Sequence, residues 1–193
     1  QPKRVTEYYR CVNREMVGSS SERTLTTTIT PKALGHIHTC FSTAFTSHKL
    51  LLDYFSFTLS IALDFRVKSS GVGHVNKSLI EQFPILQSAE IRPKLHARAL
   101  ALVSLTSHYA DLWNDCWNPA FTQQRWSIAA DSDHPGAKVL PQDFFQQLTG
   151  NWQRNCALRS DYARRQALVE IDVLVAQALG LSLDELLTIY RVQ

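Results

Sequence analysis

The sequence lacks the features that mark membrane and secreted proteins. No apolar run approaches the roughly 20 residues that span a bilayer, and the first residues do not have the basic-then-apolar order of a signal peptide. Its four cysteines include no Cys-x-x-Cys pair, which favours reduced thiols over a disulfide framework. We therefore predict a cytoplasmic protein that makes no contact with a membrane.

Signatures of common catalytic sites are also missing. There is no Gly-x-Ser-x-Gly turn, no Walker loop, and no Asp or Glu two residues before a lysine. The Gly-x-Gly at 71–73 follows a predicted helix and not a strand, which is the wrong context for a cofactor-binding turn. We expect no catalytic residue and no cofactor in this chain.

A metal site has weak support. His36, His38 and Cys40 alternate, so on a strand they would share one face. Structural zinc needs about four ligands, and no matching second pair is evident. We therefore interpret these residues as polar side chains on a sheet face and predict no metal.

Strong charge of either sign is absent too. The 193 residues carry a formal net charge of only +3, so a site for a polyanion would have to come from local clustering. Basic residues do cluster at 92–98 and at 154–165. Two interpretations stay open for these clusters, namely contacts to phosphate or solvated helix faces.

The apolar content is sufficient for a full core. At 45% hydrophobic residues, the chain is best interpreted as one domain or two closely packed lobes. The β-branched segment 23–30 predicts a strand that Pro31 stops, and 36–45 predicts a second strand that pairs with the first. A further short strand is expected near 83–86.

Helices are expected to dominate. Ser47 is the predicted N-cap of a helix through about Arg66, and Pro93 lies in the first turn of a helix that ends near 114–119. Another helix starts near Ser160 and stops at Gly180, followed by a short helix that begins with a Ser182 capping box. The predicted class is α+β, with a small sheet packed on long helices and a C-terminal helical lobe.

The predicted organisation has three parts. Residues 1–126 form an α+β region, 127–142 a surface loop rich in Asp, Pro and Gly, and 143–193 a C-terminal helical lobe. Since the chain starts without methionine and ends directly after an apolar-aromatic segment, we expect both ends to be boundaries of a fragment.

Two segments resemble a known family of enzymes. The stretch 71–85 joins two long apolar helices through a Gly-containing turn, an Asn/Lys turn and a hydrophobic-Pro-hydrophobic run. This is similar to the target-recognition regions of type I restriction systems and of adenine-N6 DNA methyltransferases. The C-terminal segments 164–172, 178–186 and 189–193 resemble the C-terminal part of large restriction-modification methylases, including type IIG-like and phage-defence enzymes. Segments 22–25 and 41–45 fit the same family less specifically.

The resemblance implies a function in DNA recognition. Such a domain positions duplex DNA while a methyltransferase domain of the same polypeptide transfers a methyl group from S-adenosylmethionine. The segment 118–121, Asn-Pro-Ala-Phe, approaches the catalytic Asn-Pro-Pro-Tyr/Phe motif but departs from it at Ala120, so we interpret it as a plain turn. The fragment is therefore expected to lack the catalytic domain, and whether the parent enzyme also cleaves DNA stays open.

The candidate DNA contacts combine this resemblance with the chemistry of base and phosphate recognition. Reading the major groove requires Arg, Lys, Asn or Gln on turns that a rigid core holds. The predicted DNA-binding residues are His74, Asn76, Lys77, Lys94, Arg98, Arg125, Arg164 and Arg165. For Asn76, a role as the cap of a short helix stays open beside DNA contact.

Competing functions remain. The tryptophan- and amide-rich run 113–126 is a second possible reader of DNA, although Trp113 and Trp117 stand four apart and would also pack on a helix. The alternative function is a docking domain of a multi-subunit phage-defence methylase that touches no base, which low net charge and abundant tryptophan favour. An autonomous enzyme is the weakest hypothesis.

Overall fold

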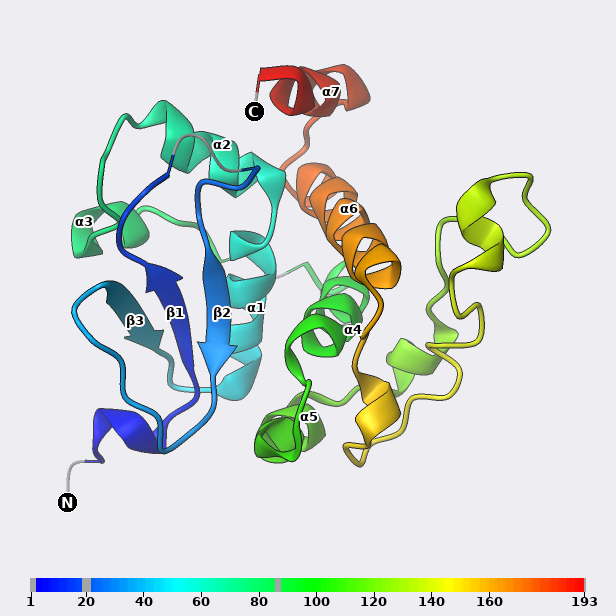
Figure 1. The fold of residues 1–193 in the computed structure, drawn as a ribbon, viewed down its shortest axis with the longest axis horizontal. Coiled ribbons are helices and arrows are strands. Elements are labelled where there is room, and N and C mark those ends of the chain that lie inside the picture. Colours follow the sequence, from blue (N-terminus) through cyan, green and yellow to red (C-terminus); the bar gives the residue numbers. More distant parts are fainter. Residues whose placement is uncertain (1–2, 19–21, 86–87, 193) are drawn as a thin grey trace.

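A small antiparallel sheet forms one side of the molecule. The computed structural model describes residues 3–18, 22–85 and 88–192. The sheet has β1 (Arg10–Arg14) in the centre, β2 (Thr27–Thr30) on one side and β3 (Cys40–Ala44) on the other. Cys11 is opposite Ile29 in β2 and opposite Thr43 in β3. Figure 1 shows the sheet beside a larger helical layer.

The sequence identified the two outer strands and paired them wrongly with each other. Both pair instead with β1, a strand that the sequence pattern did not reveal because polar residues occupy three of its five positions. Two of these polar residues, Arg10 and Asn13, are nevertheless buried. The guanidinium of Arg10 donates to the carbonyl oxygen of Leu34, in the loop between β2 and β3.

The predicted helix from Ser47 is two helices. It begins as predicted, because the Ser47 hydroxyl accepts from the amide of Leu50, but α1 (His48–Thr58) ends before Ser60 and α2 (Ile61–Ser69) starts after it. Ser60 caps α2, and the amide of Ile61 donates to Asp172 at 2.6 Å. A carboxylate far along the chain thus stabilises the break, which local periodicity could not predict.

The helix that contains Pro93 is also interrupted. α4 (Arg92–Val103) has this proline in its first turn, as predicted, and ends at Ser104. A 3-10 turn, η2 (Ser107–Tyr109), then leads into α5 (Ala110–Cys116). The short α3 (Lys77–Ile80) precedes α4. The strand expected at 83–86 is wrong for 83–85, where Phe83 closes a turn by donating to the carbonyl of Ile80; residue 86 lies outside the described residues.

The C-terminal helices match the predicted boundaries. α6 (Asp161–Ala178) starts at an N-cap on Ser160 and ends before Gly180, whose φ is 73°. α7 (Leu183–Val192) begins with the predicted capping box, in which Ser182 and Glu185 bond each other reciprocally. α6 is not detached from the rest of the molecule, because its buried face joins the same core cluster as α1 and α4.

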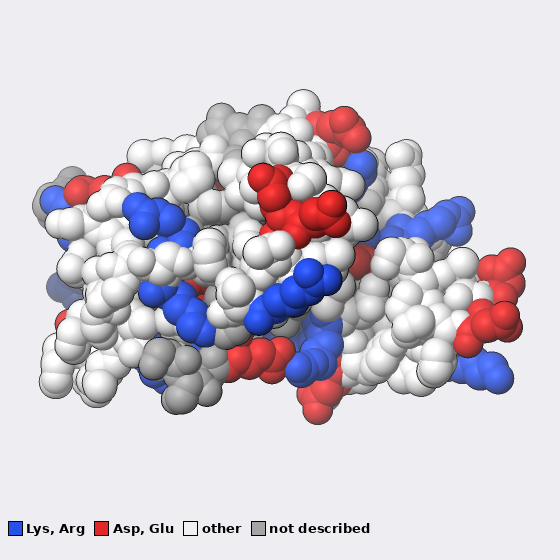
Figure 2. Space-filling view, turned by 90° about the horizontal axis from the view of Figure 1, so that it is seen from above, with Lys and Arg blue, Asp and Glu red and all other residues white. Residues whose placement is uncertain are grey.

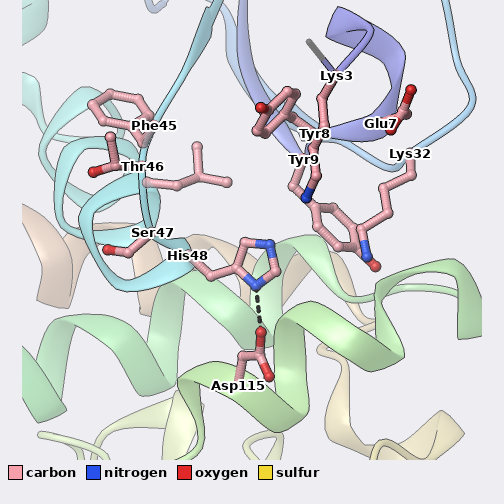
Figure 3. A pocket seen from close by; sticks show the side chains of 11 residues that line it. Lys3, Glu7, Tyr8, Tyr9, Lys32, Phe45, Thr46, Ser47, His48 and Asp115 are labelled. Atoms are coloured by element: carbon pink, nitrogen blue, oxygen red, sulfur yellow. Dashed lines mark hydrogen bonds and ion pairs between the residues drawn. The ribbon is translucent and has the colours of Figure 1, made fainter. Parts of the chain in front are cut away.

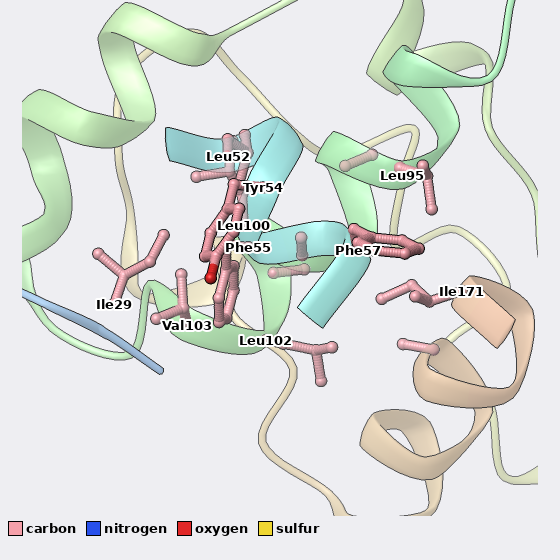
Figure 4. Packing of buried hydrophobic residues seen from close by; sticks show 14 of the residues in the cluster. Ile29, Leu52, Tyr54, Phe55, Phe57, Leu95, Leu100, Leu102, Val103 and Ile171 are labelled. Atoms are coloured by element: carbon pink, nitrogen blue, oxygen red, sulfur yellow. The ribbon is translucent and has the colours of Figure 1, made fainter. Parts of the chain in front are cut away.

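The core lies where α1 packs between the sheet and α4. Every residue of α1 from Leu51 to Thr58 is buried, and Figure 4 shows Tyr54, Phe55 and Phe57 spreading from this helix toward different neighbours. Ile171 reaches the cluster from α6. The predicted α+β, helix-dominant class is therefore confirmed. None of the described helices is long and apolar enough to cross a membrane.

A buried ionic cluster joins α1 to α4. Asp53 accepts from Nε and Nη2 of Arg92 at 2.9 and 2.8 Å, and its Oδ1 lies 2.7 Å from Nε2 of His96. Burial lowers the pKa of His96 below its ordinary value, although the bond to Asp53 opposes this shift. A neutral His96 donates from Nε2 to Asp53, and the positive charge of Arg92 then compensates the negative charge of Asp53.

This cluster predicts a dependence of stability on pH. His96 has a higher pKa in the unfolded state, so the unfolded state binds more protons than the folded state. The stabilisation from neutral His96 is therefore complete above about pH 6.5, and it is lost as the pH falls through the folded pKa. We expect His96→Gln to reduce the loss of unfolding free energy between pH 7 and 5, measured by urea denaturation. The exposed His38→Gln should keep the wild-type loss; equal losses in wild type and both variants would contradict this assignment.

Candidate nucleic-acid interface

The turn between α2 and α3 is tied to the end of the sheet. Gly71, with φ of 68°, turns the chain after α2. The amide of Val17 then donates to the carbonyl of Gly73 at 3.0 Å, and the amide of Val75 donates to the backbone carbonyl of Glu15 at 2.7 Å. The turn is therefore fastened to the segment that continues β1.

Buried apolar residues and exposed polar residues both occur along this turn and in α3. Val75, Leu79 and Ile80 are buried, whereas the side chains of His74 and Lys77 are 62% and 76% exposed. His74 lies 3.7 Å from the Glu15 carboxylate and Lys77 lies 3.5 Å from that of Glu81. Such exposed ion pairs are weak and screened by salt, so both side chains can exchange their partners for an anion.

Asn76 serves as a helix cap. Its side-chain oxygen accepts from the amide of Leu79 at 3.0 Å at the start of α3. The capping interpretation is therefore confirmed, and the amide oxygen of Asn76 is already in use. Of the three turn residues predicted to contact DNA, His74 and Lys77 keep side chains that can reach a ligand.

Three other predicted residues line one cavity. Lys94, Arg98 and Arg125 surround a space of about 240 Å³ between α4, α6 and the segment around Trp126. Lys94 forms an exposed pair with Glu90 four residues earlier, and Arg125 is exposed. These three basic residues were predicted as candidates from their charge, and in the structure they lie around one cavity.

Arg98 is an internal residue and does not face a DNA surface. It is 5% exposed, and its Nε donates to Glu170 at 2.6 Å. Its two terminal nitrogens donate to the carbonyl oxygens of Lys94 and Arg125, and the guanidinium lies over the ring of Phe145. Because all these donors are in use inside the protein, the prediction of a DNA contact by Arg98 is withdrawn.

The arginines of α6 also have partners. Arg164 donates to the carbonyl oxygens of Leu102 and Leu158 at 2.9 and 3.1 Å, which ties α6 to the end of α4. Arg165 pairs with Glu22 at 2.7 Å, and both side chains are well exposed. Arg164 is therefore a structural residue, whereas Arg165 can still reach solvent anions.

The predicted residues do not form one surface. In Figure 1, α3 lies at the sheet side of the molecule, while α4 and α6 lie on the other side of α1. Figure 2 shows basic side chains in separate groups among acidic and uncharged ones, with no continuous basic patch on the face in view. At the turn before α3, the predicted residues His74, Asn76 and Lys77 lie close together.

Sequence reasoning missed polar residues that belong to the same region. Arg66, near the end of α2, donates to the side chain of Gln82 at 3.3 Å, and both residues are exposed. Arg14, at the end of β1, donates to the carbonyl of Met16, which bridges to His74. Arg66 could have been found as one of two basic residues, with Lys68, in the last turn of the helix before the turn, but Arg14 had no signal because β1 was not recognised.

The aromatic run and the Asn-Pro-Ala-Phe segment are structural. Trp113 is buried and donates to the carbonyl of Thr149, and its ring centroid lies 6.0 Å from that of Trp117. Asn118 caps η3 (Pro119–Gln123), in which Phe121 is fully buried. Within the described ranges, no group of three or more His, Cys, Asp or Glu side chains is arranged to hold a metal ion.

Comparisons with models of known families, with curated proteins and with solved structures found no match for this chain. Its function is therefore inferred from the site itself.

The environment of Arg98 gives a test of its structural role. Replacing it with methionine leaves the 7% exposed side chain of Glu170 without its cationic partner, so we expect Arg98→Met to lower the unfolding free energy by about 3 to 5 kcal/mol. Urea denaturation measures this loss. The exposed Lys94→Met should change stability by less than about 1 kcal/mol. Equal losses in the two variants would be incompatible with a buried ion pair.

Proposed function

We propose that the chain is a DNA target-recognition module of a restriction-modification adenine-N6 methyltransferase, without the catalytic domain. One observation carries the proposal. His74 and Lys77 stand exposed beside the buried Val75, on a turn whose backbone is bonded to the segment that continues β1. Base recognition requires side chains that a rigid backbone holds in place, because ordering a flexible turn on binding costs conformational entropy.

The two residues would have different parts in binding. Lys77, a compact cation near the start of α3, suits a backbone phosphate, which sets the register and the salt dependence. His74 can donate to or accept from a base edge, and Arg14, Arg66 and Gln82 extend the polar region toward neighbouring phosphates or bases. Each good bidentate base contact would contribute on the order of 1 to 3 kcal/mol of discrimination.

The proposal extends to the parent enzyme. The methyl donor S-adenosylmethionine would be bound by a methyltransferase domain of the same polypeptide, and the complex would work on double-stranded DNA in the cytoplasm. Lys94, Arg125 and Arg165, which lie elsewhere on the surface, would then add phosphate contacts only where the path of the duplex reaches them.

A docking module is the second candidate function. The specific observation in its favour is exposed apolar surface on the C-terminal helices, where Val169 and Val173 of α6 are 46% and 41% exposed and Leu183 of α7 is 69% exposed. A partner domain on α6 and α7 would bury this surface.

Fluorescence anisotropy with mixed-sequence duplex DNA separates the two functions. We expect binding that weakens as salt rises, and we expect Lys77→Ala to reduce the slope of log affinity against log salt by about 1, the value for one phosphate contact. The matched control is Lys138→Ala, a single exposed lysine in η4 (Pro135–Lys138), which should leave the slope unchanged.

The outcomes that oppose the proposal are clear. Absence of binding at low salt would remove the DNA-reading assignment and favour the docking function. Binding that Lys77→Ala and Lys138→Ala weaken equally would show general electrostatic attraction, and would contradict a defined site at the turn before α3.

A further inference from the structure

A second cavity lies at the opposite end of β1, under η1 (Val5–Glu7). It has a volume of about 350 Å³ and lies between the N-terminal segment, the start of α1 and α5. Polar and aromatic side chains line it, including Lys3, Tyr8, Phe45, His48 and Asp115. None of these residues takes part in the proposed DNA surface.

One wall of this cavity holds an oriented histidine. Nδ1 of His48 lies 2.7 Å from Oδ2 of Asp115, so the partner on α5 fixes the ring and leaves Nε2 for other contacts. The ring of Tyr9 meets His48 edge to face at a centroid distance of 5.2 Å. In Figure 3, His48 and Lys3 reach from opposite sides toward the same space.

The basic side chains in this cavity come from separate parts of the chain. Lys3 belongs to the N-terminal segment, Lys32 to the residues after β2, where it pairs with Asp111 at 2.9 Å, and His48 to the first turn of α1. Ser47 caps the amide of Leu50, so the amide of His48 remains as a donor at the positive end of an 11-residue helix. The lysine ammonium groups and this amide are suited to a phosphate group.

Aromatic side chains provide a second kind of contact. Tyr8 and Phe45 line the cavity above His48 in Figure 3, and they offer ring faces to a flat ligand. The ammonium of Lys3 lies 5.7 Å from the centroid of Tyr8, so a phosphate bound to this lysine would place its attached group beside that ring. Glu7 on the rim supplies an acceptor for a sugar hydroxyl.

From this arrangement we propose that the cavity under η1 binds a nucleoside monophosphate. The phosphate contacts Lys3, the Nε2–H of protonated His48 and the backbone amide of His48, and the base stacks against Tyr8 or Phe45. The Asp115 side chain is 63% exposed, so solvent and salt screen its repulsion of the phosphate. The inference is independent of the proposed DNA function, since the two sites share no residue.

Isothermal titration with adenosine monophosphate tests the proposal. We expect saturable binding that Lys3→Ala weakens by about tenfold, the loss for one hydrogen bond to a charged group. The matched control is Lys49→Ala, because Lys49 is an exposed lysine one residue beyond His48 that does not line the cavity. Amide chemical shifts in NMR should move at residues 3–9 and 46–49 and not in the turn before α3.

Adenosine and inorganic phosphate serve as the remaining probes. Each should bind more weakly than the nucleotide, because each lacks one of the two kinds of contact. The proposal is overturned if adenosine monophosphate does not saturate, if either partial ligand binds as tightly, or if Lys49→Ala weakens binding as much as Lys3→Ala. Loss of DNA binding in Lys77→Ala has no effect on this test, so failures of the two proposals are distinguishable.

Discussion

Buried carboxylates at the junctions between helices are the constraint on which this fold depends. Asp172 is fully buried on α6, where it accepts from Arg23, from the amide of Ile61 and from the hydroxyl of Tyr190. These three partners belong to the segment before β2, to the start of α2 and to α7. One side chain therefore connects four separate parts of the chain, and its removal would leave the buried amide of Ile61 without its acceptor.

The same device recurs with different partners. Asp53 connects α1 to α4 through Arg92 and His96, and Glu170 connects α6 to α4 through Arg98 and to the amide of Ser127. Moving these carboxylates from water into contact with their buried partners does not by itself add much stability. It does fix how the helices meet, since an unpaired buried charge makes alternative packings costly.

This use of arginine explains why clusters of basic residues in the sequence were a poor guide to exposed cations. Arg92, Arg98 and Arg164 lie in the basic clusters of the sequence, yet each bonds an internal carboxylate or carbonyl. The basic side chains left for a ligand are exposed ones, among them Lys77 at the start of α3 and Arg165 on α6. A basic residue on a helix beside a buried acid is therefore better interpreted as part of the scaffold than as a phosphate contact.

Local sequence determined several of the helix starts and stops of this protein. Ser47, Ser160, Gly180 and the Ser182 capping box act through bonds within a few residues, so their roles could be predicted without the fold. The α+β class was predictable for the same reason, because apolar periodicity and β-branched runs are properties of single segments.

Tertiary structure alone decided the arrangement of the sheet and of the sites. β1 is a strand because two neighbours supply its hydrogen bonds and a distant loop receives Arg10, and the long apolar run after Ser47 breaks at Ser60 because Asp172 accepts from Ile61. The cavity under η1 likewise combines residues from four segments. Such features depend on partners far apart in the chain, and the pattern within a short window contains no information about which partners will meet.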